Sequence, residues 1–303
     1  EDVREDRRRW LMQVQEDISA DKLAARIDSV IEVLVDEVDE EGTIARSKAD
    51  APEMRAWLGC YNAWKPDLLI DCHVTDGIDF QYNLTYSMEL FENAPPPIVE
   101  WQKGLREAFT AGMEKFGDPV CPYVFPREDN DLLKGLVTYA APPRFSTGYA
   151  AIRNRAAVLI ETHMLKSYKA RVTATYRLLI EILRHVNASA AALTQAARDA
   201  DEETVQLFSA VRDTAFFPIA FTAGTASTPL RFLGYESSMT KSDISGGSYP
   251  RWDHAKPLTV TIPMFDDVRP SKRIRPPLAY IIPQEWHDAI EVLRAHGVLL
   301  ERL

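Results

Sequence analysis

The sequence predicts an α/β protein, with a mixed sheet and flanking helices followed by a β-rich carboxyl-terminal appendage. Two short apolar runs, residues 68–72 and 156–160, have the length and composition of buried strands. Amphipathic helical spacing lies between and after them, over residues 98–116 and from residue 165 onward. The stretch 204–282 is instead broken by Gly, Pro and Asp, a pattern typical of short strands.

Composition and charge limit the possible functions. The chain has 303 residues, 46% hydrophobic and 26% charged, enough to bury an ordinary core. Its net charge of −10 makes nucleic acid or an anionic membrane an unfavourable partner, because both bind clustered Lys and Arg. No apolar run reaches the length of a membrane span, and the first residues are charged, so we expect no signal peptide. Three Cys without C-x-x-C spacing favour a reducing compartment, and we expect a cytoplasmic location.

Residues 1–50 are expected to form a helix and a β-hairpin. Residues 5–26 have helical spacing. Residues 30–38 alternate as a strand and end in the acidic run 36–41, after which Gly42 turns the chain into a second strand at 43–46. A break in composition then separates this segment from the rest.

From residue 51 the pattern becomes that of an α/β domain reaching residue 203, followed by a β-rich extension over 204–303. Pro52 opens a helix that leads into the first apolar strand. The long helix after residue 165 should bury a stripe of apolar side chains, namely Leu165, Tyr168, Val172, Tyr176, Leu179 and Leu183. A final helix over 283–296 should turn Trp286 inward and stop at Gly297.

Ionisable residues follow both apolar strands. Asp71 and His73 share a face by the two-residue period of a strand, and Glu161 and His163 end the second run. Neighbouring parallel strands end at one edge of a sheet, so we expect His73 and Glu161 within about 6 Å of each other. The pair could serve as metal ligand and general base. It could equally be a buried histidine and a carboxylate that caps a helix.

The amino-terminal run WLMQVQEDISADKLAARIDSVIEVLVDEVDEEGTIARSKADAPE resembles a segment of the radical-SAM methylthiotransferases that modify ribosomal protein S12. The words DEVDEEG and ARSKADAPE carry the resemblance, over residues 1–53. In that family the segment follows an iron–sulfur catalytic domain and begins the TRAM domain, a small β-barrel. The resemblance implies recognition of RNA or a ribosomal partner, although the acidic run disfavours direct contact with phosphate.

The runs DLLIDCHVTDGIDFQYNLTY and RNRAAVLIETHMLKSYKARVTATYRLLIEIL are similar to the carboxyl-terminal half of zinc carboxypeptidases of the carboxypeptidase A type, in a bacterial branch. This resemblance covers about residues 50–303. It implies a zinc cofactor and hydrolysis of carboxyl-terminal residues from peptides or proteins. By motif, His73 would be a zinc ligand and Glu161 the catalytic glutamate that activates the zinc-bound water.

Other residues would support this site. The resemblance makes Tyr149, Arg153 and Arg155 candidates for contact with substrate, the last two for its carboxylate. Three further residues would form hydrogen bonds to the metal ligand or bind the metal themselves, namely Asp71, Asp76 and His163.

The zinc ligands of the family are incomplete here, because no His is followed three residues later by Glu. A catalytic zinc takes three protein ligands, so we expect weak zinc binding and impaired activity in a sheet that lacks its amino-terminal half. The alternative function is a TRAM-like RNA- or ribosome-associated binding module fused to a non-catalytic peptidase scaffold. On either view two unrelated pieces join near residues 50–53.

Overall fold

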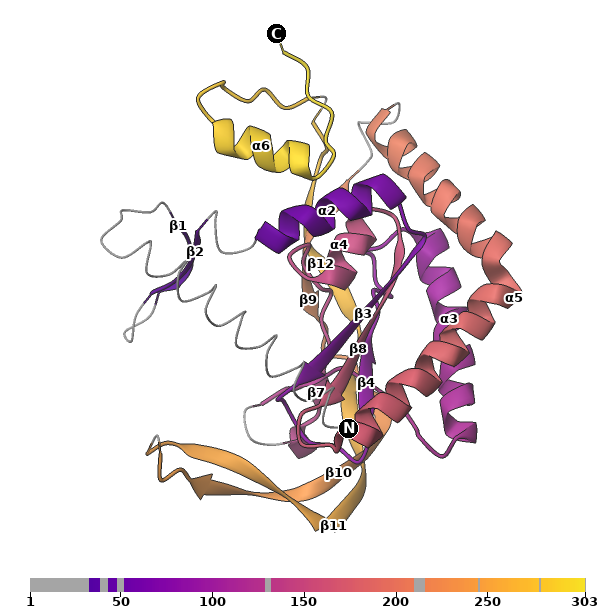
Figure 1. Ribbon diagram of the computed structural model, residues 1–303, viewed down its shortest axis with the longest axis vertical. Coiled ribbons are helices and arrows are strands. Elements are labelled where there is room, and N and C mark those ends of the chain that lie inside the picture. Colours follow the sequence, from indigo (N-terminus) through magenta and orange to yellow (C-terminus); the bar gives the residue numbers. More distant parts are fainter. Residues whose placement is uncertain are drawn as a thin grey trace, which may run out of the picture. The chain divides into compact units, whose positions relative to one another are not determined.

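The computed structural model describes residues 33–38, 43–47, 52–128, 132–209, 216–244, 246–277 and 279–302 (Figure 1). The chain forms two compact units. The first combines Glu1–Lys65 with Ile282–Leu303, and the second is Pro66–Ile281. The helix expected at 5–26 lies outside the described residues.

The first unit contains the expected hairpin. Strand β1 (Val33–Val38) pairs antiparallel with β2 (Thr43–Ser47), and the register shifts between Val35 and Glu37. An irregularity of this kind adds local twist to a two-stranded ribbon. The prediction of two antiparallel strands on either side of Gly42 is confirmed.

Two helices of the first unit are joined by a side-chain hydrogen bond. In α2 (Pro52–Trp64), Asn62 Nδ2 donates to the carbonyl oxygen of Ala295 at the end of α6 (His287–Ala295), at 2.8 Å. Gly297 follows with φ 77°, the left-handed conformation that commonly ends a helix. The expected stop is thus confirmed, but Trp286 is 60% exposed, so its predicted inward orientation is wrong.

The second unit contains a mixed sheet with strand order β3-β8-β4-β5. Strands β3 (Leu68–Thr75) and β8 (Ala156–His163) run parallel. Strand β4 (Leu84–Ser87) runs antiparallel to β8, and β5 (Cys121–Pro122) is parallel to β4. Because β8 has a neighbour on each side, its apolar run is buried, as its composition requires.

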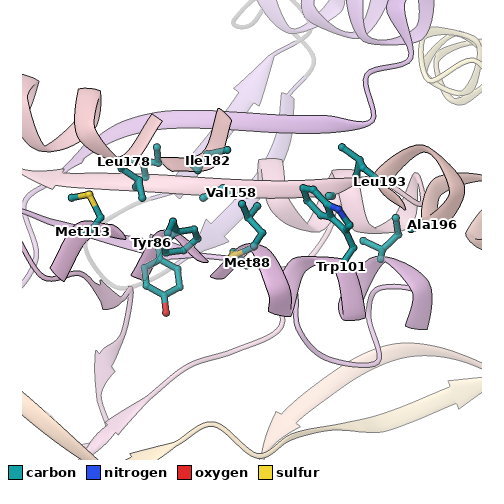
Figure 2. Packing of buried hydrophobic residues seen from close by; sticks show 14 of the residues in the cluster. Tyr86, Met88, Trp101, Met113, Val158, Leu178, Ile182, Leu193 and Ala196 are labelled. Atoms are coloured by element: carbon teal, nitrogen blue, oxygen red, sulfur yellow. The ribbon is translucent and has the colours of Figure 1, made fainter. Parts of the chain in front are cut away.

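Helices cover one face of this sheet. Figure 1 shows α3 (Pro96–Lys115) and α5 (Tyr168–Ser209) side by side across β8 and β4, while the short α4 (Ser146–Ile152) precedes β8. Figure 2 shows Val158 and Tyr86 of the sheet packed among Trp101 and Met113 of α3 and Leu178 of α5. These contacts make one apolar core between sheet and helices.

Helix α5 buries a different stripe from the one expected. The expected side chains are largely exposed, at 76% for Tyr168, 65% for Tyr176 and 56% for Leu183. The buried residues are Ala174, Leu178 and Ile182, each at 0%. The helix carries two apolar stripes, and the one with smaller side chains lets α5 approach the sheet closely. Spacing alone did not distinguish them.

Helix α5 is kinked at Ser189, whose φ of −130° and ψ of 22° are not helical. Its hydroxyl donates to the carbonyl oxygen of His185 at 2.7 Å and accepts from Trp101 Nε1 at 3.3 Å. A serine that bonds back to the preceding turn often bends a helix. The bend continues the helix over the apolar residues Leu193, Ala196 and Ala197 of the same core.

A second sheet has strand order β10-β11-β7-β6, and a separate pair joins β12 to β9. Their bounds are β6 (Phe125–Pro126), β7 (Leu136–Val137), β9 (Phe217–Ala223), β10 (Thr228–Lys241), β11 (Ser248–Phe265) and β12 (Val268–Ile274), and a short 3-10 helix, η1 (Leu132–Lys134), precedes β7. The prediction of short strands is wrong for β10 and β11, which are long and form one hairpin. β11 pairs on its second side only at Met264 and Phe265, so Pro250 and Pro257 remove no bond from that side.

The hairpin is tied to the first sheet by a buried ion cluster. Asp79, fully buried in the connection between β3 and β4, lies 2.8 Å from Lys166 Nζ and 2.6 Å from His254 Nε2 of β11. Lys166 also donates to the carbonyl oxygen of Phe80. Burial raises the pKa of Asp79, but hydrogen bonds from Lys166 and His254 and the positive charge of Lys166 outweigh it, so the pKa lies below its ordinary value.

Among helices in the described ranges, none has the length and hydropathy to cross a lipid bilayer.

Asp79→Asn is expected to lower the free energy of unfolding by about 3 kcal/mol, because Lys166, with only 9% of its side chain exposed, loses its counter-charge. Chemical denaturation monitored by circular dichroism measures the change. The matched control is Asp243→Asn at an exposed position, which should stay within about 0.5 kcal/mol of the parent. Equal effects of the two substitutions would contradict a stabilising ion cluster.

Candidate functional site

The parallel pairing of β3 with β8 creates the candidate site. Register places His73 directly opposite Glu161, near the carboxyl ends of both strands. His73 Nδ1 lies 3.7 Å from Glu161 Oε1. The prediction that these two side chains meet, although 88 residues separate them, is confirmed.

Asp71 occupies the other side of the imidazole. Its Oδ2 lies 2.9 Å from His73 Nε2, as expected for residues two apart on one face of a strand. Each ring nitrogen therefore faces a carboxylate, Nε2 at hydrogen-bond distance and Nδ1 somewhat further away. The His73 side chain is 51% exposed, so the imidazole connects a buried carboxyl group with solvent.

Glu161 is the most strongly perturbed group of the site. Its side chain is 9% exposed, and its Oε2 is buried without a hydrogen-bond partner among the described residues. Burial raises the pKa of Glu161, and the negative charges of Asp71 and Asp76 raise it further, while His73 opposes them. A buried carboxyl oxygen without a donor favours the protonated, neutral form. The arrangement therefore places a carboxyl group with a raised pKa next to an imidazole that is half exposed.

Two other predicted residues have different surroundings. His163 Nδ1 accepts from the backbone N–H of Leu165 at 3.1 Å, so its Nε2 carries the hydrogen that is donated to the Gly77 carbonyl oxygen at 3.0 Å. These bonds orient the imidazole, whose Nδ1 also lies 3.8 Å from Asp79 Oδ1, and tie the β3–β4 connection to the end of β8. Asp76 is exposed in that connection and affects Glu161 through its charge.

Tyr149, Arg153 and Arg155 are not brought to the site. Arg153 Nη1 donates to the Tyr149 hydroxyl at 2.9 Å, and Arg155 forms a two-pronged ion pair with Asp201 at 3.0 and 3.1 Å. Arg155 precedes the first residue of β8, whereas Glu161 lies six residues further along. At the rise of an extended strand this separates them by roughly 20 Å. Arg155 therefore links the segment between α4 and β8 to α5 at the opposite end of the strand, while Arg153 bonds back to Tyr149 of α4.

Sequence analysis missed a second buried carboxyl group nearby. Glu89, 2% exposed, accepts from the Asn93 amide, the Thr147 hydroxyl and the Ala141 backbone N–H. Burial raises the pKa of Glu89, although these donors oppose it. The sequence gives only a weak signal for Glu89, because residues 84–88, which precede it, alternate apolar and hydroxyl side chains and do not form an apolar run like the one before Glu161. The negative charges of Glu89 and Glu161 both raise the pKa of Tyr139, so the two carboxyl groups lie close enough to affect the same side chain.

The donor set does not fit the zinc ion that the sequence led us to expect. In the part of the chain that the structure describes, no group of three or more His, Cys, Asp and Glu side chains is arranged to hold a metal ion. His73 has its two nitrogens directed at carboxylates, and His163 is held by the backbone. A catalytic zinc needs three protein ligands with one open position.

Comparison with curated proteins finds relatives over a short segment. The ribosomal protein uS12 methylthiotransferase RimO of Dechloromonas aromatica is 93% identical over 54 residues, which are 18% of this chain and 12% of that protein. The same enzyme of Hydrogenovibrio crunogenus is 59% identical over 54 residues, with the same shares. That of Shewanella baltica OS155 is 42% identical over 77 residues, 25% of this chain and 16% of the relative. No family model and no solved structure matches the chain.

These relatives support the resemblance to S12 methylthiotransferases. They do not support the resemblance to zinc carboxypeptidases. The chain spans only 12–16% of the length of these three relatives. The prediction of a zinc metallocarboxypeptidase, a hydrolase that removes carboxyl-terminal residues, is therefore wrong, and so is the predicted zinc cofactor. The motifs around His73 and Glu161 describe two strands that end in ionisable residues, a local pattern that many α/β sheets provide.

Glu161→Gln is expected to change how stability depends on pH. A raised pKa means that the folded state holds the proton more tightly than the unfolded state, so its stabilising effect is complete below the unfolded pKa of about 4.3 and is lost as the pH rises through the folded pKa. The variant should therefore gain stability relative to the parent as the pH rises. Thermal unfolding from about pH 4 to about pH 8 measures this difference.

The matched control is Glu114→Gln at an exposed position of α3, whose difference from the parent should not vary with pH. A constant difference for Glu161→Gln as well would show that Glu161 has an ordinary pKa.

Proposed function

We propose that this chain is a binding protein whose amino-terminal segment recognises a ribosomal protein, with the remaining α/β unit as its scaffold. The observation that carries this proposal is the 93% identity over 54 residues to a protein named for its action on ribosomal protein uS12. The described strands β1 and β2 support it, because they form the antiparallel hairpin expected within that segment.

Charge favours a protein partner over RNA. The run 36–41 holds five acidic residues, and the whole chain has a net charge of −10. Negative charge repels phosphate, whereas a ribosomal protein that contacts ribosomal RNA must present Lys and Arg. Complementary charge of this kind speeds association and makes it sensitive to salt.

The full chain is expected to bind purified uS12 in biolayer interferometry, with affinity that falls as salt increases. Neutralising the acidic run should weaken binding at least about tenfold, because charge complementarity is lost. The substitutions are Asp36→Asn, Glu37→Gln, Asp39→Asn, Glu40→Gln and Glu41→Gln.

A control with the same change in net charge neutralises five acidic residues of α3 and α5, namely Glu107, Glu114, Asp199, Glu202 and Glu203, and should bind like the parent. The proposal fails if uS12 is not bound or if both five-residue variants bind equally. Tighter binding of ribosomal RNA than of uS12 would make RNA the partner.

A second candidate function is favoured by the unpaired Oε2 of Glu161. We propose that Glu161 stores a proton and exchanges it through His73, with Asp71 orienting the imidazole. Nε2 of His73 lies at hydrogen-bond distance, 2.9 Å, from Asp71 Oδ2, whereas Nδ1 lies 3.7 Å from Glu161 Oε1, so the exchange requires the two side chains to move closer together or to share a water molecule. Proton exchange between a carboxyl group and an imidazole is the elementary step of acid–base chemistry.

An infrared difference spectrum of parent minus Glu161→Gln should contain the band of a protonated carboxyl group, and the band should persist to a higher pH than that of an exposed glutamate, because burial raises the pKa of Glu161. In Asp71→Asn the same band should disappear at lower pH, because the negative charge of Asp71 helps to raise the pKa of Glu161. Absence of the band at every pH would exclude a stored proton. If the band disappears at the same pH in Asp71→Asn as in the parent, Asp71 does not influence the pKa of Glu161 and has no part in the proton exchange.

A further inference from the structure

A pocket of about 260 Å³ lies in the second unit, between the end of β4, helix α3 and the end of β11. Its apolar wall includes Phe91, Tyr123 and Met264, and Tyr86 contributes an aromatic ring. Tyr86 is the register partner of Ile160, whereas the preceding Thr85 is the partner of Glu161. Successive residues of a strand point to opposite faces, so the ring of Tyr86 lies on the core face of β4, while the next lining residue, Ser87, lies on the other face at the end of the strand.

Two cations of α3 line this apolar pocket. Within the described ranges, Arg106 forms no ion pair with a carboxylate. Lys103 reaches only Glu100, at 3.8 Å, and that carboxylate is 83% exposed, so the pair is weak. The one acidic group of the lining is Asp266, at an exposed position after β11. Positive charge without a close counter-charge is unusual on a chain of net charge −10.

Tyr86 adds a neutral hydrogen-bonding group beside these cations. Its side chain is 7% exposed, and its ring packs edge-on against Phe109 at 4.9 Å between centroids. Burial raises the pKa of Tyr86 to about 12, although the nearby charge of Arg106 opposes the shift. The phenol therefore keeps its hydrogen at neutral pH. The phenol also forms a hydrogen bond with Thr110 of α3, so an anionic group would be held mainly by the cations, through charge-assisted hydrogen bonds.

We infer that this pocket binds a small organic anion with a flat apolar body, whose carboxylate or phosphate is held by Arg106 and Lys103. Arginine presents a planar fork of donors that matches either group. The aromatic and thioether side chains give the apolar body a surface on which to pack. This site is independent of the proposed recognition of a ribosomal protein, which rests on the amino-terminal segment.

The size of the pocket sets the class of ligand. Pockets for drug-sized ligands occupy about 300–1,000 Å³, so a space of about 260 Å³ suits a metabolite with a single ring. It is too small to enclose a peptide segment or an oligonucleotide. The ligand is therefore a small molecule.

Isothermal titration calorimetry of the full chain with phenylacetate and with phenyl phosphate tests the inference. At least one of them should bind saturably, and the tighter one identifies the anionic group. The neutral analogue phenylacetamide should bind at least about tenfold more weakly than phenylacetate, because the charge-assisted bonds are lost. Inorganic phosphate should bind more weakly than phenyl phosphate, because it lacks the ring.

Arg106→Gln should weaken the tighter anion at least about tenfold, while Arg198→Gln, at an exposed position of α5, should leave its affinity unchanged. Ser87→Leu fills the pocket without altering either cation and should also abolish binding. Thermal unfolding verifies that each variant is folded. The inference is overturned if neither anion saturates, if the amide binds as well as the anion, or if Arg106→Gln and Ser87→Leu, both folded, bind like the parent.

Discussion

The parallel pairing of β3 with β8 is the constraint on which the second unit depends. Eight consecutive residue pairs, from Leu68 opposite Ala156 to Thr75 opposite His163, fix which side chains meet. A shift by one residue would turn the apolar side chains of β8 away from α3 and α5 and into the face of the site. The core of Val158, Ile160, Leu178 and Ile182 thus holds the register that brings Glu161 to His73.

Local patterns predicted much of this arrangement. The strand runs after Pro66 and Arg155, the helix over Ile98–Phe116 and the turn at Gly42 each show their period or their turn residue within a few positions. The meeting of His73 with Glu161 followed from one further rule, that neighbouring parallel strands end together. That rule cannot identify chemistry, because any pair of such strands places polar residues at the same edge. The metal assignment therefore needed ligands that the described part of the chain does not bring together.

What could not be predicted depends on contacts between distant segments. Asp79 meets His254 across 175 positions, and the partner is set by how the β10–β11 hairpin folds back. Its long strands were read as several short ones because Pro250 and Pro257 look like breaks, yet β11 tolerates them where its second side is unpaired. The pocket beside Arg106 likewise draws residues from β4, α3 and β11, and none of these segments shows it alone.

Alternation along the same strands explains why two chemically different environments lie back to back. On β8 the residues Ala156, Val158 and Ile160 join the apolar core, and the odd-numbered residues, which include Glu161 and His163, point to the other face. On β4, Thr85 and Tyr86 divide in the same way. The face with carboxyl groups raises the pKa of Glu161 by burial and by negative charge, while the core face leaves the charge of Arg106 beside aromatic rings. Alternation along one strand thus gives the buried carboxyl group of Glu161 and the apolar core residues of β8 different surroundings, although they are neighbours in the sequence.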